Sequence, residues 1–391
     1  MTFILNELSE TLAPYPMEEL KRIANRLKER NIEVLDFGTG DPGIPVWQPI
    51  IDEMQRTTVS LSQYPSILGI AELQKAQESY LARRFNLQKN GKWSTLPTRG
   101  SKEAIFHIAL SLIGRKGKKA LLFPNPGYPV YLSSVQFAQG KPLPYEVNAE
   151  NNYLVEPWTL PKSQAKDIAA LWINYPHNPT GAVCDEKYLE NLVDWCHQND
   201  CVLLSDECYT DIYTEIDKPV IPPTPLNISQ EGVLAFYSLS KRSGLTGYRS
   251  GFMAGDATIL AKHQRARANF GLAMPVSTQW GSIAAWNDDQ HVRERRQVFT
   301  RRIQMVGNFL LERKLISELP QATFYFWIKI PPQFGTNDVQ FCIDLSELGV
   351  IATPSSWLGD GVEGYFRLAL VPEDEETQKM LAILGRFLES K

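Results

Sequence analysis

The sequence predicts an α/β fold in which a large domain is built on a mostly parallel sheet and a smaller domain is of the α+β type. Two observations predict this fold. From about residue 93, short apolar runs alternate with segments of helical periodicity, which is the pattern of βαβ units. After about residue 285, a long charged helical segment leads into a mixture of strands and helices. The chain of 391 residues also exceeds the length at which one core usually stops growing, so we expect two domains.

The elements of the large domain follow from its hydrophobic pattern. In chain order the pattern predicts a helix over 102–113, a strand over 120–123, a helix over 129–138, a strand over 168–173, a helix over 186–198 and strands over 201–205 and 233–237. Continuous apolar runs of this length are typical of parallel strands that helices cover on both faces. Ligands of such sheets bind beyond the carboxyl ends of the strands, so polar residues there are the functional candidates.

The smaller domain is predicted from the C-terminal part of the chain. We expect a helix over 290–313, a strand over 322–328, a helix over 337–348, a strand over 364–370 and a terminal helix over 374–389. The proline-rich segment 219–225 is predicted to be a loop inside the large domain, because apolar runs continue on both sides of it.

Composition excludes several classes of function. The formal net charge of -4 argues against nucleic acid or an anionic membrane as the main partner. No apolar run approaches the ~18 residues of a membrane span, and the N-terminus lacks the basic region of a signal peptide. The five cysteines form no C-x-x-C pair and the five histidines have no ligand spacing, so we expect no disulfide framework and no metal site. A reducing cytoplasm fits this composition best.

The segment 238–249, Ser-Leu-Ser-Lys-Arg-Ser-Gly-Leu-Thr-Gly-Tyr-Arg, sets one lysine between hydroxyls and an arginine directly after an apolar run. This setting is typical of an imine-forming lysine beside a phosphate. We expect the positive charges of Arg249 and Arg242 to lower the pKa of Lys241 and so to free its amine. The alternative for Lys241 alone is a solvated basic turn.

Polar residues follow three consecutive predicted strands. Asn178 lies in the turn Asn-Pro-Thr-Gly after the first, Asp206 and Tyr209 follow the second, and Lys241 follows the third. An isolated Asp at a strand end more often starts a turn, but three polar clusters at one sheet edge face a common crevice. Pyridoxal 5'-phosphate has a pyridine nitrogen, a phenolic oxygen, an aldehyde and a phosphate, which would use all of these groups.

The turn Arg99-Gly-Ser-Lys-Glu103 opens a predicted helix and is a candidate for the phosphate site. The backbone N–H groups of Ser101 and Lys102 at the helix N-terminus would bind an anion. The alternative is that Ser101 is a simple N-cap. Tyr128, in Asn-Pro-Gly-Tyr, offers an aromatic face to a pyridine ring, although core packing is the more common role of a tyrosine.

Together these motifs resemble the fold-type I pyridoxal-phosphate aminotransferases, the aspartate aminotransferase superfamily, from about residue 14 to the C-terminus. The resemblance implies a seven-stranded sheet between helices, a large domain of residues 44–284, and a small domain that combines 1–43 with 285–391. It also implies that Lys241 forms an imine with the cofactor, that Asp206 meets the pyridine nitrogen, and that Tyr209 and Asn178 bond the phenolic oxygen. The phosphate would be held by Ser101, Lys102, Ser238, Ser240 and Arg249, with Tyr128 stacked on the ring.

The resemblance extends to the substrate and to a second subunit. Arg367 would bind the substrate α-carboxylate, a role that suits its planar fork of donors, with Asn178 beside it. Gly38 would allow close backbone approach to the same substrate. Tyr64, in Gln-Tyr-Pro-Ser-Ile-Leu-Gly, resembles the tyrosine that reaches the phosphate of the neighbouring subunit, which implies a homodimer with shared sites. The implied reaction is ping-pong amino transfer between an amino acid and a keto acid such as 2-oxoglutarate, with Lys241 moving the α-proton.

Four other functions compete with this one. Residues 38–43, Gly-Thr-Gly-Asp-Pro-Gly, match a dinucleotide-binding pattern, but Pro42, Pro45 and Pro49 break the helix that the pattern requires. Ser238-Leu-Ser-Lys241 matches the S-x-x-K motif of penicillin-recognising enzymes, but no K-T-G motif occurs. A cofactor-sensing regulator would need a basic DNA-binding domain, for which there is no room before residue 14. A lyase or decarboxylase on the same fold is harder to exclude.

Within the family, three segments are most similar to N-succinyl-diaminopimelate aminotransferases of bacterial lysine synthesis. These are Ala13-Pro-Tyr-Pro16, the stretch 267–274, and Ala285-Trp-Asn-Asp288 followed by His291-Val292. The alternative amino donors are aspartate, alanine and LL-diaminopimelate, each paired with 2-oxoglutarate or glutamate. For the distal end of the substrate the sequence offers only basic candidates such as Arg22, Arg265 and Arg267.

Overall fold

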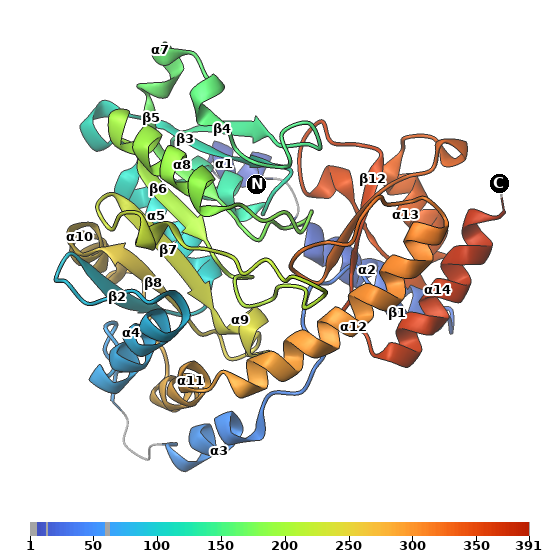
Figure 1. Cartoon of the computed structure of the whole chain (residues 1–391), viewed down its shortest axis with the longest axis horizontal. Helices are drawn as coiled ribbons and strands as arrows, with labels where there is room; N and C mark the ends of the chain where they lie inside the picture. The colour runs from blue at the N-terminus through green and yellow to red at the C-terminus, as the bar shows by residue number, and fades with distance from the viewer. Residues whose placement is uncertain (1–5, 13–14, 59–62, 391) are drawn as a thin grey trace, which may run out of the picture.

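A computed structural model of the chain describes residues 6–12, 15–58 and 63–390. Ala13 and Pro14, which belong to one of the motifs used to predict the substrate, lie outside the described residues. Figure 1 shows a larger body around a central sheet and a smaller body that contains the C-terminus, with the long helix α12 (Gln290–Glu312) running from one to the other.

The large body is built on seven strands in the order β2-β8-β7-β6-β5-β3-β4. All neighbouring strands are parallel except that β8 runs antiparallel to both β2 and β7. This confirms the predicted, mostly parallel seven-stranded sheet. The strands are β2 (Trp93–Thr98), β3 (Ala120–Asn125), β4 (Lys141–Glu146), β5 (Ile168–Ile173), β6 (Val202–Asp206), β7 (Val233–Ser238) and β8 (Gly251–Asp256).

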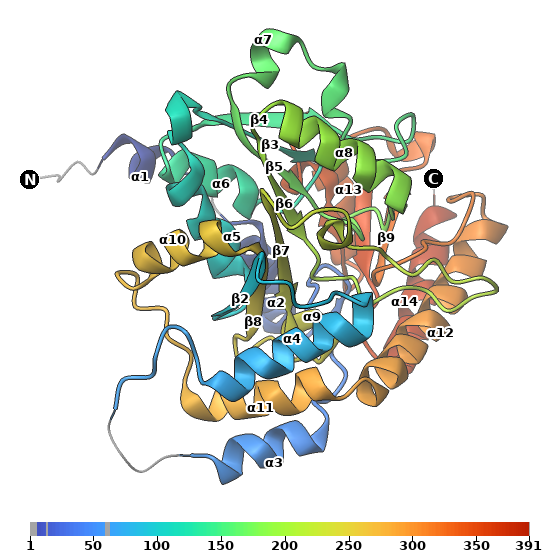
Figure 2. The same cartoon turned by 60° about the vertical axis from the view of Figure 1, so that its left-hand side comes forward.

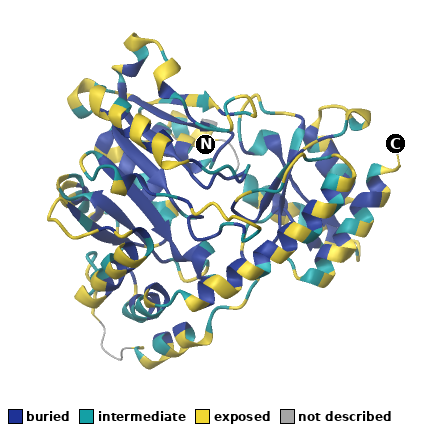
Figure 3. Ribbon diagram, viewed as in Figure 1, coloured by how far each residue is buried: buried dark blue, intermediate teal, exposed yellow. Residues whose placement is uncertain are grey.

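Helices cover both faces of this sheet (Figures 1 and 2). One face packs against α5 (Ser101–Leu112), α6 (Val130–Phe137) and α10 (Ala257–Arg267). The other face packs against α4 (Ala71–Phe85), α8 (Glu186–Gln198) and α11 (Val276–Asn287), with α3 (Gln48–Arg56) outside α11. Because both faces are covered, β5, β6 and β7 are buried along their whole length, as Figure 3 shows. Shorter helices are η1 (Arg115–Gly117), η2 (Pro157–Thr159), α7 (Lys162–Ala165), η3 (Pro225–Asn227) and α9 (Leu239–Arg242).

The small body combines the two ends of the chain. β1 (Leu35–Asp36) pairs in parallel with β10 (Val350–Ile351), and β11 (Thr353–Pro354), β12 (Tyr365–Ala369) and β9 (Tyr325–Lys329) form an antiparallel sheet in that order. Around them lie α2 (Pro16–Glu29), α12, α13 (Asp338–Ser346) and α14 (Asp374–Leu388). The remaining elements are α1 (Glu7–Thr11), η4 (Pro332–Phe334) and η5 (Ser355–Trp357).

The predicted strand over 322–328 begins only at Tyr325. Thr323 has a left-handed φ of +69°, and its N–H donates to the Ile212 carbonyl at 2.6 Å, so residues 322–324 follow another path. Other predicted elements agree with the structure to within two residues at most ends. The segment 219–224 has no regular structure, as predicted, and η3 begins at Pro225.

The division of the chain into 44–284 and 1–43 with 285–391 remains our proposal. The hydrophobic clusters support this division. Two of them lie on the faces of the large sheet, and a separate one lies between α12, α13, α14 and the small sheets. Ala285 and Trp286 pack with the large cluster, which favours a boundary just after them. Within the described ranges, none of the helices is both long and apolar enough to cross a membrane.

Candidate active site

A cavity of about 610 Å³ lies beyond the carboxyl ends of β5, β6 and β7. Nearly all of the side chains predicted to be functional line it. They are Ser101, Lys102, Tyr128, Asn178, Asp206, Tyr209, Ser238, Ser240, Lys241, Arg249 and Arg367. These residues come from both bodies of the molecule, so the structure brings together groups that are far apart in the sequence. The remaining two, Gly38 and Tyr64, do not line the cavity and are described below.

Lys241 lies on the short helix α9, which begins where β7 ends. The Ser238 hydroxyl caps this helix by accepting the N–H of Ser240 at 3.1 Å. The amine of Lys241 donates a hydrogen bond to the carbonyl oxygen of Gly40, in the loop that follows β1. The helix therefore holds the amine at the edge of the cavity nearest the small body.

Arg242 does not supply the charge that the sequence suggested beside Lys241. Its buried guanidinium donates to Asp211 at 2.9 Å and to Asp289 at 2.7 Å, so its positive charge is paired with two carboxylates. Arg249 is the arginine of this segment that lines the cavity.

Asp206 is the last residue of β6, and only 4% of its surface is exposed. Its Oδ2 accepts the hydroxyl of Tyr131 at 2.8 Å, and its Oδ1 accepts the N–H of Cys208 at 3.2 Å. Burial raises the pKa of Asp206, while hydrogen bonds from Cys208 and Tyr131 and the charge of Lys241 act in the opposite direction.

Asn178 and Tyr209 are held by bonds to residues of the small body. The Asn178 side-chain oxygen accepts Nη1 of Arg367 at 2.9 Å, and the Tyr209 hydroxyl lies 2.8 Å from the hydroxyl of Tyr325. Burial raises the pKa of Tyr209 well above its usual range, so its hydroxyl stays protonated. Both side chains are thus fixed before any ligand binds.

The N-terminus of α5 forms a cradle with the chemistry of an anion site. Its N-cap is Gly100, which has φ +78° and no side chain to occupy the first N–H groups, so the alternative of Ser101 as a simple N-cap is wrong. A Cβ on Gly100 would lie 2.6 Å from Nη2 of Arg249, and one on Gly251 would lie 3.2 Å from the N of Ser101. Backbone N–H groups, the Ser101 hydroxyl and the Arg249 guanidinium therefore converge beside Gly100, where a side chain would crowd them.

Arg367 lies on β12 with only 3% of its surface exposed. Nη2 donates to the Gly38 carbonyl at 2.7 Å, and the guanidinium lies 4.3 Å from the centre of the Tyr325 ring. In the described part of the chain, its buried Nε has no hydrogen-bond partner. Gly38 lies behind the arginine, because a Cβ on Gly38 would meet Leu20 at 3.1 Å rather than the cavity.

Two predicted groups lie elsewhere. Tyr64 is fully exposed, at 103% of its reference area, and does not line the cavity of its own chain. Arg267, a candidate for the distal end of the substrate, is fully buried and donates to the Pro97 carbonyl at 2.9 Å and to Glu103 at 2.5 Å. It is therefore a structural residue, and Arg22 and Arg265 are also absent from the cavity wall.

Sequence patterns missed part of the wall. The additional residues include Tyr15, Glu18, Lys21, Thr39, Asp41, Asn174, Cys208 and Tyr325. Most of them lie on α2, on the loop after β1 or on β9. These segments belong to the small body and border the cavity beside the strand ends. The loop carries Gly-Thr-Gly-Asp-Pro-Gly. Its glycines and proline indicated an irregular backbone here, although they do not form a dinucleotide site.

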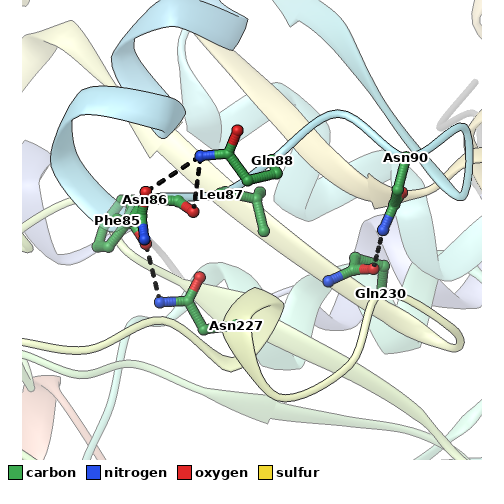
Figure 4. A pocket seen from close by; sticks show the side chains of 7 residues that line it. All are labelled: Phe85, Asn86, Leu87, Gln88, Asn90, Asn227 and Gln230. Atoms are coloured by element: carbon green, nitrogen blue, oxygen red, sulfur yellow. Dashed lines mark hydrogen bonds between the residues drawn. The ribbon is translucent and has the colours of Figure 1, made fainter.

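A second cavity, of about 380 Å³, lies at the end of α4 and beside η3 (Figure 4). Amide side chains dominate its wall, and they bond to nearby groups. Asn90 donates to Gln230 at 2.9 Å, and Asn227 donates to the Phe85 carbonyl at 3.0 Å. None of the described residues of this wall has a charged or nucleophilic side chain, so the chemistry belongs to the first cavity.

Residues 32–384 match the family described as aminotransferase class I and II. The chain belongs to this family. It is 31% identical over 382 residues to the LL-diaminopimelate aminotransferase of Syntrophobacter fumaroxidans, with 97% of each chain covered. The solved structure of aminotransferase AspB from Helicobacter pylori has a TM-score of 0.85 and 29% identity, covering 97% of this chain and 100% of that one.

A probable N-succinyldiaminopimelate aminotransferase from Thermus thermophilus has a TM-score of 0.85, with 96% of this chain and 100% of that chain covered. Its identity of 24% means that this likeness shows the fold alone. The family assignment makes this protein a transaminase that acts on amino and keto acids, and it removes the dehydrogenase and penicillin-recognising alternatives.

Aminotransferases of this family depend on pyridoxal phosphate. The residues of the cavity fit this cofactor. An amine lies at Lys241, a buried carboxylate lies at Asp206, and the glycine-lined cradle at the N-terminus of α5 suits a phosphate.

Proposed function

We propose that this aminotransferase moves an amino group from LL-diaminopimelate to 2-oxoglutarate, with Lys241, Asp206 and Tyr209 as its catalytic residues. The observation that carries the proposal is the single cavity in which an amine, a carboxylate, an anion cradle and a buried arginine meet. The class of reaction follows from the family, and the choice of donor rests on the charges of the cavity wall.

Bound pyridoxal phosphate supplies an aldehyde that links to amines and a ring that accepts electrons from the substrate α-carbon. Lys241 would link to the aldehyde, Asp206 would face the ring nitrogen, and Tyr209 with Asn178 would donate to the phenolic oxygen. The phosphate is held by Ser101, Lys102, Ser238, Ser240 and Arg249, with Tyr128 against the ring. Each of these residues lines the cavity, which supports the assignment.

Lys241 also moves a proton. The Nζ of Lys241 would accept the proton of the substrate α-carbon as a general base. The Gly40 carbonyl, which accepts a hydrogen bond from this amine, keeps it within the cavity. The amino group is transferred in two half-reactions, so ping-pong kinetics follow.

Arg367 binds the α-carboxylate of the substrate. Its guanidinium is already oriented by Asn178, Gly38 and the ring of Tyr325, so little rotamer entropy is lost when a carboxylate binds. A planar pair of donors matches the two oxygens of a carboxylate, which a lysine would not do.

The distal end of the substrate distinguishes the candidate donors. In LL-diaminopimelate this end carries an ammonium and a carboxylate, whereas N-succinylation masks the ammonium and adds a carboxylate. The part of the wall formed by α2 and the loop after β1 carries both signs of charge, namely Glu18, Lys21, which bonds to Glu18 at 3.3 Å, and Asp41. A wall of mixed charge matches a zwitterion, and its carboxylates disfavour a succinyl group.

This substrate was one of the alternatives in the sequence analysis, where N-succinyl-diaminopimelate came first. The curated relatives named LL-diaminopimelate aminotransferase, at about 30% identity over nearly the whole chain, favour the alternative. Aspartate and alanine lack the distal ammonium that a wall of mixed charge would bind, so we expect them to be poor donors.

A panel of half-reactions tests the choice of donor. The purified enzyme loaded with pyridoxal phosphate is mixed with LL-diaminopimelate, N-succinyl-LL-diaminopimelate, aspartate or alanine, and the loss of visible absorbance is followed. We expect kcat/KM for LL-diaminopimelate to exceed the others by at least ~100-fold. A faster reaction with the succinylated donor, or equal rates with all four, would contradict the proposed substrate.

We further propose a homodimer in which Tyr64 reaches the phosphate of the partner subunit. The complete exposure of this tyrosine in the single chain supports a role outside its own subunit. The cytoplasmic location expected from composition also remains a proposal.

A further inference from the structure

The carboxylate of Asp206 is held by donors that no sequence motif pointed to. Tyr131, on α6, donates its hydroxyl to Oδ2 at 2.8 Å, and the backbone N–H of Cys208 donates to Oδ1 at 3.2 Å. The backbone carbonyl of Asp206 is fixed as well, because the side-chain amide of Asn174 donates to it at 2.8 Å. Both the position and the rotation of the carboxylate are therefore determined before a ligand is present.

Packing fixes Tyr131 in turn. The residue is fully buried, its ring stacks on Trp172 with centres 5.0 Å apart, and the edge of Tyr128 meets it at 5.8 Å. Burial raises the pKa of Tyr131 well above its usual range, so the phenol keeps its proton and donates to the carboxylate. Tyr131 is not among the residues that line the cavity, so it acts on a ligand through its wall neighbours, Asp206 by a hydrogen bond and Tyr128 by a ring contact.

The electrostatic surroundings of Asp206 make this bond important. The titratable groups that face the carboxylate are Tyr128, Tyr131, Cys208 and Lys241. Among these four described residues Lys241 is the only basic one, and its amine would be altered by a link to the cofactor. Burial favours the protonated acid, so neutral hydrogen-bond donors must keep the carboxylate ionised.

We propose that Tyr131 is a positioning residue that keeps the Asp206 carboxylate ionised and directed at the ring nitrogen of the cofactor. The inference rests on the proposed role of Asp206. By donating to Oδ2, while the Cys208 N–H donates to Oδ1, the phenol fixes the rotation of the carboxylate and stabilises the negative charge that would hold a proton on the ring nitrogen.

The test uses the holoenzyme loaded with pyridoxal phosphate that carries ¹⁵N in its ring. The ¹⁵N chemical shift reports the protonation of the ring nitrogen, and it is followed from about pH 6 to 9. In the wild type we expect the nitrogen to lose its proton only near the upper end of this range. In Tyr131→Phe we expect it to lose its proton at least about one pH unit lower, with cofactor affinity about 10-fold weaker, as for loss of a hydrogen bond to a charged group.

The matched control is Tyr188→Phe. Tyr188 is another buried tyrosine, and its hydroxyl donates to the Val155 carbonyl at 2.7 Å, far from Asp206 in the hydrogen-bond network. The control should lose comparable thermal stability and keep the wild-type ¹⁵N profile. Incorporation of 3-fluorotyrosine at position 131 keeps the ring and its hydroxyl but strengthens the donor, so the shift should move in the direction opposite to Tyr131→Phe.

An Asp206→Asn variant separates the role of Tyr131 from that of Asp206. If it leaves the ¹⁵N profile unchanged, the proposed role of Asp206 fails. If Asp206→Asn changes the profile while Tyr131→Phe matches the wild type, or if fluorotyrosine and phenylalanine shift it in the same direction, the role of Tyr131 is refuted and that of Asp206 stands.

Discussion

Lys241 is the residue on which the proposed chemistry depends. It is partly exposed, and its side chain bonds to a carbonyl rather than to a carboxylate, so its removal should cost the fold little. We expect Lys241→Ala to lose the covalent link to the cofactor and to lower turnover by about 10⁴-fold or more, because both the link and the general base are lost. Borohydride reduction followed by peptide mass analysis should find the cofactor on Lys241 of the wild type.

The control for this substitution is Lys166→Ala, which removes an exposed lysine away from the cavity. This variant should keep both the turnover and the cofactor that borohydride attaches to Lys241. Near-normal turnover of Lys241→Ala, or a label on another lysine of the wild type, would show that the assigned residue is wrong.

Individual residues differ in how readily the sequence reveals them. Asp206 directly follows an apolar run and Lys241 comes a few residues after the next one, so their place at the strand ends could be predicted without a structure. Tyr131 and Tyr325 lie in apolar segments where a tyrosine normally signals core packing, and only tertiary contacts with Asp206 and Tyr209 give them a role. The same limit explains why Arg267 seemed free, since its partner Glu103 lies on another helix.

Elements were predictable where burial alone determines their pattern. β5, β6 and β7 are buried on both faces and therefore appear as apolar runs. β8, Gly-Phe-Met-Ala-Gly-Asp, contains two glycines, and β4, Lys-Pro-Leu-Pro-Tyr-Glu, is an edge strand with two prolines, so neither resembles a buried strand in sequence. Their strand character comes from neighbours in the sheet, which a local pattern does not contain.

The N-terminus of α5 is the element that should respond most to a small change. Gly100 has φ +78° and ψ 160°, a conformation that alanine adopts only at a cost of ~1–3 kcal/mol, and its Cβ would press on Nη2 of Arg249. We expect Gly100→Ala to lower the free energy of unfolding by about that amount and to weaken cofactor binding by at least ~10-fold. Equilibrium titration with pyridoxal phosphate and denaturant unfolding measure the two effects.

Gly114→Ala provides the comparison, since Gly114 also has a positive φ, +86°, but a Cβ there meets nothing within 4 Å. It should lose stability and keep the affinity for the cofactor. Equal loss of affinity in both variants would mean that strain, and not crowding of the anion cradle, is responsible.

At the scale of the whole molecule, the cavity depends on contacts between the two bodies. Arg367 of the small body bonds to Asn178 of the large one, and Tyr325 bonds to Tyr209 in the same way. Gly40 and Lys241 form a third link across the cavity. These bonds fix the distance between the α-carboxylate site and the cofactor site. A bound amino acid must span this distance, with its α-carbon between the two sites.

The proposed dimer extends this dependence to a second subunit. If Tyr64 donates to the partner's phosphate, Tyr64→Phe should weaken cofactor binding by about 10-fold without preventing dimer formation. Mixing Tyr64→Phe with Lys241→Ala then creates dimers in which the cavity that keeps Lys241 receives an intact Tyr64 from the other chain. Cofactor bound covalently at limiting concentration should rise in the mixture above the level of Tyr64→Phe alone, because an isologous dimer exchanges the same residue in both directions.

Replacing the second partner with the double variant Lys241→Ala, Tyr64→Phe removes the donated hydroxyl and should abolish this rise. A rise in both mixtures would indicate that dilution or exchange, rather than Tyr64, restores binding. A chain that sediments as a monomer, or a Tyr64→Phe variant with wild-type affinity, would mean that each cavity is complete within one subunit.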